Sequence, residues 1–125
     1  MQLCSGTLSL STRQKKYVMR LATSEYIAKN TAGDSVSLTL SLYAPEPDPK
    51  SEQGDYRCKV EIQGISFEKY AYGVDSLQAL CLAVETLRLT IDSLISDGWS
   101  FYFPTHLDEP FDFTSAYFPM TGLRL

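Results

Sequence analysis

The sequence predicts an α+β fold: an antiparallel β-meander of about four strands, covered on one face by a single long helix and followed by an aromatic C-terminal segment. Three observations lead to this prediction. Two stretches alternate apolar and polar side chains, a later stretch repeats apolar side chains at helical spacing, and aromatic side chains are concentrated near the C-terminus. The chain of 125 residues, 1–125, has the length of a single domain with one core.

The strands are expected in the first half of the chain. Residues 16–29 are rich in Tyr, Val, Ile and Thr, which predicts one strand or a bent pair. Residues 36–42 and 56–63 alternate apolar and polar side chains, and a turn at Gly64 leads into a further strand. The proline-rich residues 45–55 are expected to form an exposed loop. The side chains expected to face the core are Val36, Leu38, Leu40, Leu42, Tyr56, Cys58, Val60 and Ile62.

One helix is expected over residues 76–96. Asp75 is a favourable N-cap, and Gln78 follows it at the spacing of a capping box. Gly98 follows the last apolar residue and suits the left-handed conformation that ends many helices. At about 100° per residue, one broad apolar arc is expected to face the sheet, formed by Leu77, Leu80, Cys81, Val84, Leu87, Ile91, Leu94 and Ile95.

Leu82 and Leu89 lie on the otherwise polar side of this helix. They are seven residues apart and therefore lie on one line along the helix. This line predicts a covering element, either the aromatic tail or a second copy of the helix across a two-fold axis. The second alternative predicts a homodimer.

Residues 99–125 form the aromatic C-terminal segment, whereas residues 1–15 are expected to be flexible. The segment holds eight of the fifteen aromatic residues (one Trp, eight Tyr, six Phe), and exposing all of them to water is unfavourable. It is expected either to seal an edge of the core or to form a surface for a partner. The predicted interaction surface consists of Leu82, Leu89, Trp99, Phe101, Phe103 and Tyr117.

Composition and charge argue against several classes of function. A net charge of -4 opposes extensive binding to nucleic-acid phosphates. The apolar runs are shorter than the ~18 residues of a membrane span, and the N-terminus lacks the charge order of a secretory signal. The three widely spaced cysteines match neither a disulfide framework nor a zinc site, which favours a reduced, cytoplasmic protein.

Two residues stand in contexts that could carry chemistry. Ser76 lies in a Gly-Val-Asp-Ser-Leu string that resembles the phosphopantetheine attachment site of carrier proteins, but strands precede it where those proteins have helices. His106 has acidic neighbours at positions 108, 109 and 112, but no regular period directs them to one metal ion. The sequence therefore predicts no catalytic, cofactor-binding or metal-binding residue, and no enzyme activity.

Two strings together resemble a family of small, uncharacterised bacterial domains. They are Gly-Asp-Tyr-Arg-Cys, within residues 54–58, and Ala-Tyr-Gly-Val-Asp-Ser-Leu-Gln-Ala-Leu, residues 71–80. The resemblance covers Tyr26 to Leu94. It implies a bacterial source and a cytoplasmic setting, and it carries over no catalytic residue.

Two functions are compatible with these patterns. The first is a non-enzymatic protein-interaction module, comparable by size and acidic charge with immunity and antitoxin proteins. The alternative is a small-molecule-binding domain in which Trp99, Tyr102 and Tyr117 line a pocket under the aromatic C-terminal segment. The expected partner is a protein or a second copy of this chain, with no cofactor, nucleic acid or membrane.

Overall fold

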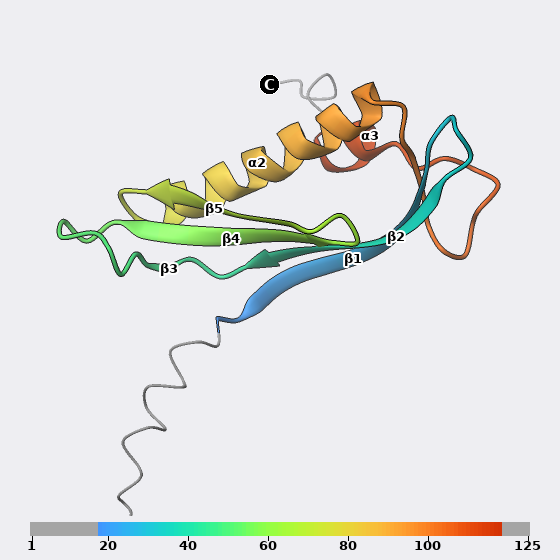
Figure 1. Ribbon diagram of the computed structural model, residues 1–125. Coiled ribbons are helices and arrows are strands. Elements are labelled where there is room, and N and C mark those ends of the chain that lie inside the picture. Colours follow the sequence, from blue (N-terminus) through green and yellow to red (C-terminus); the bar gives the residue numbers. More distant parts are fainter. Residues whose placement is uncertain (1–17, 119–125) are drawn as a thin grey trace, which may run out of the picture.

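The computed structural model describes residues 18–118 and confirms the predicted α+β class (Figure 1). In this part of the chain, a sheet of six strands carries a long helix across one face. The expected flexibility of residues 1–15 concerns residues outside the described range. The elements are β1 (Arg20–Lys29), β2 (Ser35–Tyr43), β3 (Glu46–Pro47), β4 (Tyr56–Gln63), β5 (Phe67–Gly73), α2 (Ser76–Ser96), β6 (Ser100–Tyr102) and α3 (Phe113–Tyr117).

Strand β4 organises the sheet because it pairs with three other strands. β5 lies along one of its edges, and β2 and β3 lie along the other; β1 follows β2, and β6 follows β1, all antiparallel. The register places Ile62 opposite Leu40 and Cys58 opposite Ala71. Directly opposed side chains lie on the same face, so the apolar side chains of neighbouring strands meet on one side of the sheet.

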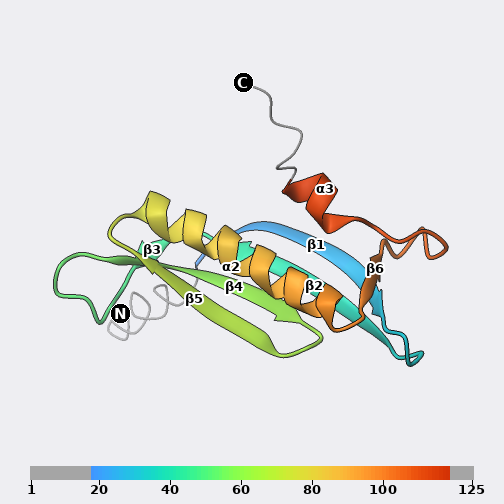
Figure 2. The ribbon, with the colours of Figure 1, turned by 90° about the horizontal axis from the view of Figure 1, so that it is seen from above.

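The core lies between this inner face and the helices (Figure 2). Beneath the first half of α2, Cys58, Val60 and Ala71 pack with Ala79 and Ala83. The rest of the inner face forms a second buried cluster with the aromatic tail. Its members are Tyr26, Ala28, Leu38, Leu40, Ile62, Ile91, Phe101 and Phe113.

The aromatic C-terminal segment completes this second cluster. Phe101 lies in β6 opposite Ala28 and is only 2% exposed. Phe113 begins α3, and its ring centroid lies 4.8 Å from that of Phe101 and 4.7 Å from that of Tyr26. Of the two expectations for this segment, the described residues up to 118 therefore follow the one in which it packs back on the core.

The strands differ from the sequence prediction in three places: β1 is a single strand, and β3 and β6 are two short strands that were not predicted. The segment expected as one strand or a bent pair is the single strand β1, with a register irregularity between Arg20 and Ala22. β3 lies inside the expected proline-rich loop, where Pro47 is tolerated because β3 pairs on one side only, with β4, among the described residues. β6 lies in the aromatic segment, where no strand was predicted.

Helix α2 begins and ends as its terminal residues dictate. The Asp75 carboxylate accepts a hydrogen bond from the Gln78 backbone N–H at 2.8 Å, and the Gln78 side chain accepts one from the Val74 N–H at 2.7 Å. The reciprocal bond thus goes to the residue before the N-cap. At the other end, Gly98 has a φ of +99° and its N–H bonds to the Ile95 carbonyl, which closes the last turn.

The face of α2 that packs on the sheet is not the centre of the predicted apolar arc. Ala79 and Ala83 are fully buried, and a Cβ built on Gly73 would lie only 2.5 Å from the Ala79 backbone nitrogen. This close approach requires small side chains, so the helix is rotated toward its alanines and carries larger arc members away from the sheet. The prediction of burial was wrong for Leu77, Cys81 and Ile95.

The contact at Gly73 predicts a local sensitivity. Gly73→Ala is expected to lower the free energy of unfolding by about 1–3 kcal/mol, because the new methyl group meets the α2 backbone, which cannot move without displacing the helix. Val74→Ala, at a 70%-exposed neighbour, is the control and is expected to change it by less than ~0.5 kcal/mol. Urea denaturation of both variants measures the difference, and equal stabilities would contradict this packing.

Candidate functional site

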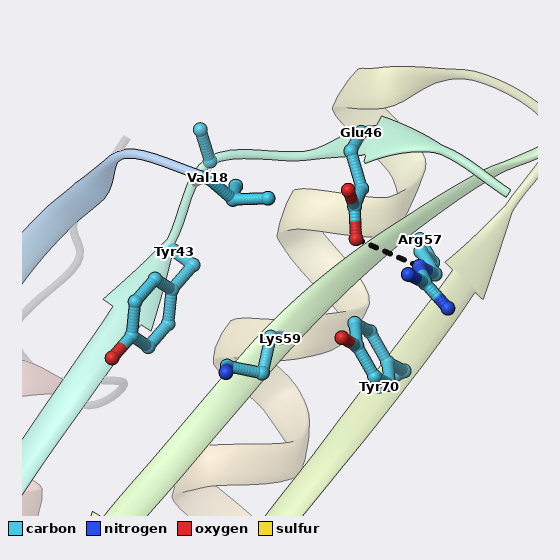
Figure 3. Close-up of a pocket in the computed structure, with 7 residues that line it drawn as sticks. Val18, Tyr43, Glu46, Arg57, Lys59 and Tyr70 are labelled. Carbon is cyan, nitrogen blue, oxygen red and sulfur yellow. Dashed lines mark hydrogen bonds and ion pairs between the residues drawn. The ribbon is translucent and has the colours of Figure 1, made fainter. Parts of the chain in front are cut away.

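A hollow of about 330 Å³ lies on the outer face of the sheet, the face opposite α2 (Figure 3). Within residues 18–118 no helix covers this face. The floor and walls come from the end of β2, from β3, β4 and β5, and from the residues before β1. The lining residues are Val18, Tyr43, Ala44, Glu46, Arg57, Lys59 and Tyr70.

Strand alternation explains why charged side chains gather here. Cys58 and Val60 point into the core, so Arg57 and Lys59 must point to the outer face. The register places Glu46 of β3 opposite Arg57 and Tyr70 of β5 opposite Lys59. Opposed residues share a face, and the hollow therefore collects side chains from three adjacent strands.

The Arg57 guanidinium is held on two sides. Its Nε donates to a Glu46 carboxylate oxygen at 2.7 Å, and its central carbon lies 4.1 Å from the centre of the Tyr70 ring. The side chain is 23% exposed. Partial burial alone would lower the pKa of Arg57, but the hydrogen bond and charge of Glu46 raise this pKa above its ordinary value. Arg57 is thus a fixed, permanent cation.

Lys59 repeats this arrangement one step along β4. Its ammonium lies 3.0 Å from a Glu68 carboxylate oxygen and 4.6 Å from the centre of the Tyr43 ring. Partial burial would lower the pKa of Lys59, whereas the Glu68 carboxylate raises it above the ordinary value. The Tyr43 hydroxyl donates to Glu61 at 2.7 Å, which fixes the ring under the ammonium.

The chemistry of the hollow is that of recognition. Its cations lie over aromatic rings and against carboxylates, so charge and hydrogen-bonding geometry are set before anything binds. The described residues contain no group of three His, Cys, Asp or Glu side chains placed to hold a metal ion. His106 is exposed, and its Nδ1 lies 2.9 Å from the Thr105 hydroxyl. Neither α2 nor α3, the helices of residues 18–118, is long and apolar enough to cross a lipid bilayer.

The structure separates the residues of the interaction surface predicted from sequence. Leu82 and Leu89 are 42% and 53% exposed on α2, and Leu89 borders a groove formed with β5. Tyr117 is also exposed but borders a different groove, beside β1 and β2. Trp99 and Phe103 are half-buried against the core. Phe101 is corrected from surface to core, because β6 pairing turns its ring inward.

The groove beside Tyr117 is apolar and lies partly under the C-terminal segment. Its volume is about 220 Å³, and it is lined in part by Tyr26 and Tyr117, whose hydroxyls are hydrogen-bonded to each other. Burial raises the pKa of Tyr26 well above its ordinary value; the Ser24 hydrogen bond opposes this effect and Tyr117 adds to it. The remaining lining residues are Ala22, Thr23, Ser24, Leu40, Ser41, Leu42 and Leu87.

Sequence reasoning did not single out the outer-face hollow. The alternation in β4 places Arg57 and Lys59 on the polar side, which reads as an ordinary solvated face. The signal that could have marked the site is that Tyr43 and Tyr70 occupy outward positions on β2 and β5, the strands that flank β4. Tyrosine combines a large apolar ring with a hydroxyl and is enriched at interfaces, so two such rings beside cations on a polar sheet face indicate a candidate binding surface.

Comparison with known proteins gives a family without an assigned activity. Residues 13–98 match the model of a domain family of unknown function, DUF6968. Searches of curated proteins and of solved structures find no match. The matched range contains β1 to β5 and α2, and thus the described strands that line the hollow, whereas β6 and α3 lie outside it. The chain therefore belongs to the DUF6968 family, a domain of unknown function.

Proposed function

We propose that this protein is a non-enzymatic interaction module that binds a partner protein through the outer face of its sheet. The observation that carries the proposal is the two cations lying over tyrosine rings in the hollow, Arg57 over Tyr70 and Lys59 over Tyr43. Arg and Tyr are among the side chains that contribute most to protein interfaces. Their fixed positions reduce the side-chain entropy lost when a partner docks.

The hollow is part of a wider accessible face, which favours a protein partner. Tyr72 lies next to Tyr70 on the same side of β5, with ring centroids 6.4 Å apart, and is 54% exposed. The analogy with immunity and antitoxin proteins depends on the net charge of -4 and gains nothing from the hollow, whose cations are paired with carboxylates. A bacterial, cytoplasmic setting is part of the proposal and depends on the sequence resemblance.

A capture experiment tests the outer face. The tagged protein is used to isolate binding proteins from its source cells at physiological salt, and the recovered protein is purified for calorimetric titration. Arg57→Ala and Tyr70→Ala are each expected to weaken its binding at least tenfold, about 1.4 kcal/mol, because each removes half of a stacked pair. Leu107→Ser, an exposed change outside the hollow, is the control. Binding that neither Arg57→Ala nor Tyr70→Ala weakens would contradict the proposal.

The apolar groove beside Tyr117 favours a second candidate function, the binding of a small apolar molecule. The lining combines four aliphatic side chains with five that carry hydroxyls, and the surface exposed in the groove is mostly apolar, as in many ligand pockets. Thermal denaturation in the presence of metabolite pools is expected to show stabilisation by one pool. Ala22→Trp fills the groove and should abolish this effect, whereas Ala32→Trp, in an exposed turn, should not. Absence of stabilisation by every pool would contradict this candidate.

The exposed line of Leu82 and Leu89 supports a homodimer as a further proposal. Leu89 borders the groove between α2 and the edge strand β5, and Leu82 lies seven residues earlier on the same line of the helix, so a second helix would bury both side chains. Sedimentation velocity at high micromolar concentration is expected to show a dimer that Leu82→Glu combined with Leu89→Glu converts to a monomer. Leu77→Glu, at another exposed leucine of α2, should leave the dimer intact. A monomeric wild-type protein would overturn this proposal.

A further inference from the structure

We propose that the hollow is a carboxylate site, in which the free end of the Arg57 guanidinium receives an aspartate or glutamate side chain of the partner protein. The inference rests on the proposed function and adds the chemistry of the docking group. It follows from which nitrogens of Arg57 are already used, which are free, and what surrounds them.

One side of the Arg57 guanidinium is hydrogen-bonded, and the end that carries Nη1 and Nη2 is not. Nε donates to Glu46, whereas Nη1 and Nη2 have no hydrogen-bond partner among the described residues. In that part of the protein, every buried side-chain nitrogen or oxygen has a partner. The two Nη groups are therefore accessible to solvent, although the side chain as a whole is mostly covered. Figure 3 shows Glu46 bonded at one side of the guanidinium and none of the other labelled residues bonded to it.

The orientation of this free end is fixed before binding. The Glu46 bond and the Tyr70 ring hold the guanidinium from its edge and from its face. Two parallel N–H groups in such a plane match the two oxygens of a carboxylate, which is the geometry of bidentate Arg–carboxylate pairs. A lysine at this position would keep the charge but would lose the match.

The charges around the hollow favour a singly charged group. Three cations, Arg20, Arg57 and Lys59, lie over its tyrosine rings, and three carboxylates, Glu46, Glu61 and Glu68, bond to its side chains. The formal charges cancel, so the site has no excess charge to attract a dianion. Recognition then depends on hydrogen-bond geometry at Arg57, and a carboxylate is expected to bind in preference to a phosphate.

The accessible face around the hollow favours a carboxylate that belongs to a protein side chain over one that belongs to a small free acid. Tyr70 and Tyr72 extend the contact surface along β5 beyond the volume that a small acid would fill. A side chain that projects from a protein surface can place its carboxylate at Arg57 while its backbone rests on these rings. We therefore assign the site to an acidic side chain of a partner.

The test is a titration of the isotope-labelled full-length protein, followed by the NMR signals of the Arg57 Nε–H and the Tyr70 ring. The probe is N-acetyl-glutamate amide, which has one side-chain carboxylate; N-acetyl-glutamine amide is its uncharged match. Saturable shifts are expected with the first probe at millimolar concentration and not with the second. N-acetyl-glycine, which mimics the terminal carboxylate of a polypeptide, and inorganic phosphate are expected to bind at least threefold more weakly.

Arg57→Lys is the decisive variant because it keeps the charge and removes the planar fork. It is expected to weaken binding of N-acetyl-glutamate amide at least tenfold, while Arg88→Lys, at a surface ion pair on α2, leaves it unchanged. Thermal denaturation checks that both variants are folded. Equal binding by wild type and Arg57→Lys, or tighter binding of phosphate or N-acetyl-glycine, would overturn the assignment.

The same variant separates this inference from the proposed function. If the captured partner binds more weakly to Arg57→Ala and Tyr70→Ala but equally well to wild type and Arg57→Lys, the outer face is the interface and the carboxylate site is wrong. If binding of the glutamate probe depends on Arg57 but no partner protein binds, the carboxylate site is supported and the protein-binding function is wrong.

Discussion

The alternation of side chains along β4 is the constraint on which the core and the candidate site both depend. Cys58, Val60 and Ile62 enter the core, whereas Arg57 and Lys59, at alternate positions of the same strand, line the hollow. A one-residue shift in pairing would bury the charges and expose the core. The three strands that pair with β4 therefore stabilise the fold and, through the same register, place the tyrosines beside the cations.

The packing on the inner face explains why no helix of residues 18–118 covers the outer face. α2 and the aromatic segment both pack on the inner side, and the glycine–alanine contact between β5 and α2 brings helix and sheet close together. The structure thus concentrates its apolar side chains in one layer and leaves the other side of the sheet to polar and aromatic groups. On that side, cation–ring contacts and ion pairs organise the surface in place of a packed core. This division is what makes the outer face suited to recognition.

The sequence predicted the elements better than their packing. Period-two alternation located β2 and β4, and Asp75 with Gly98 bounded α2, because these signals are local. Local patterns could not reveal β3 and β6, which exist only through pairing with distant strands. The helical spacing of large apolar side chains also predicted the wrong face of α2 to pack on the sheet. The small Ala79 and Ala83 determine that face, and they are fully buried. The hollow was missed for a related reason, since its rings and cations meet only across strands.

Site-specific photo-crosslinking tests whether the outer face of the sheet is the binding surface. A benzophenone amino acid is placed at Tyr72, on the outer face, or at Leu89, on α2, and the protein is irradiated in its source cells. A crosslink to a partner protein is expected from position 72, and none to that protein is expected from position 89. A partner crosslinked from position 89 and not from position 72 would contradict this expectation.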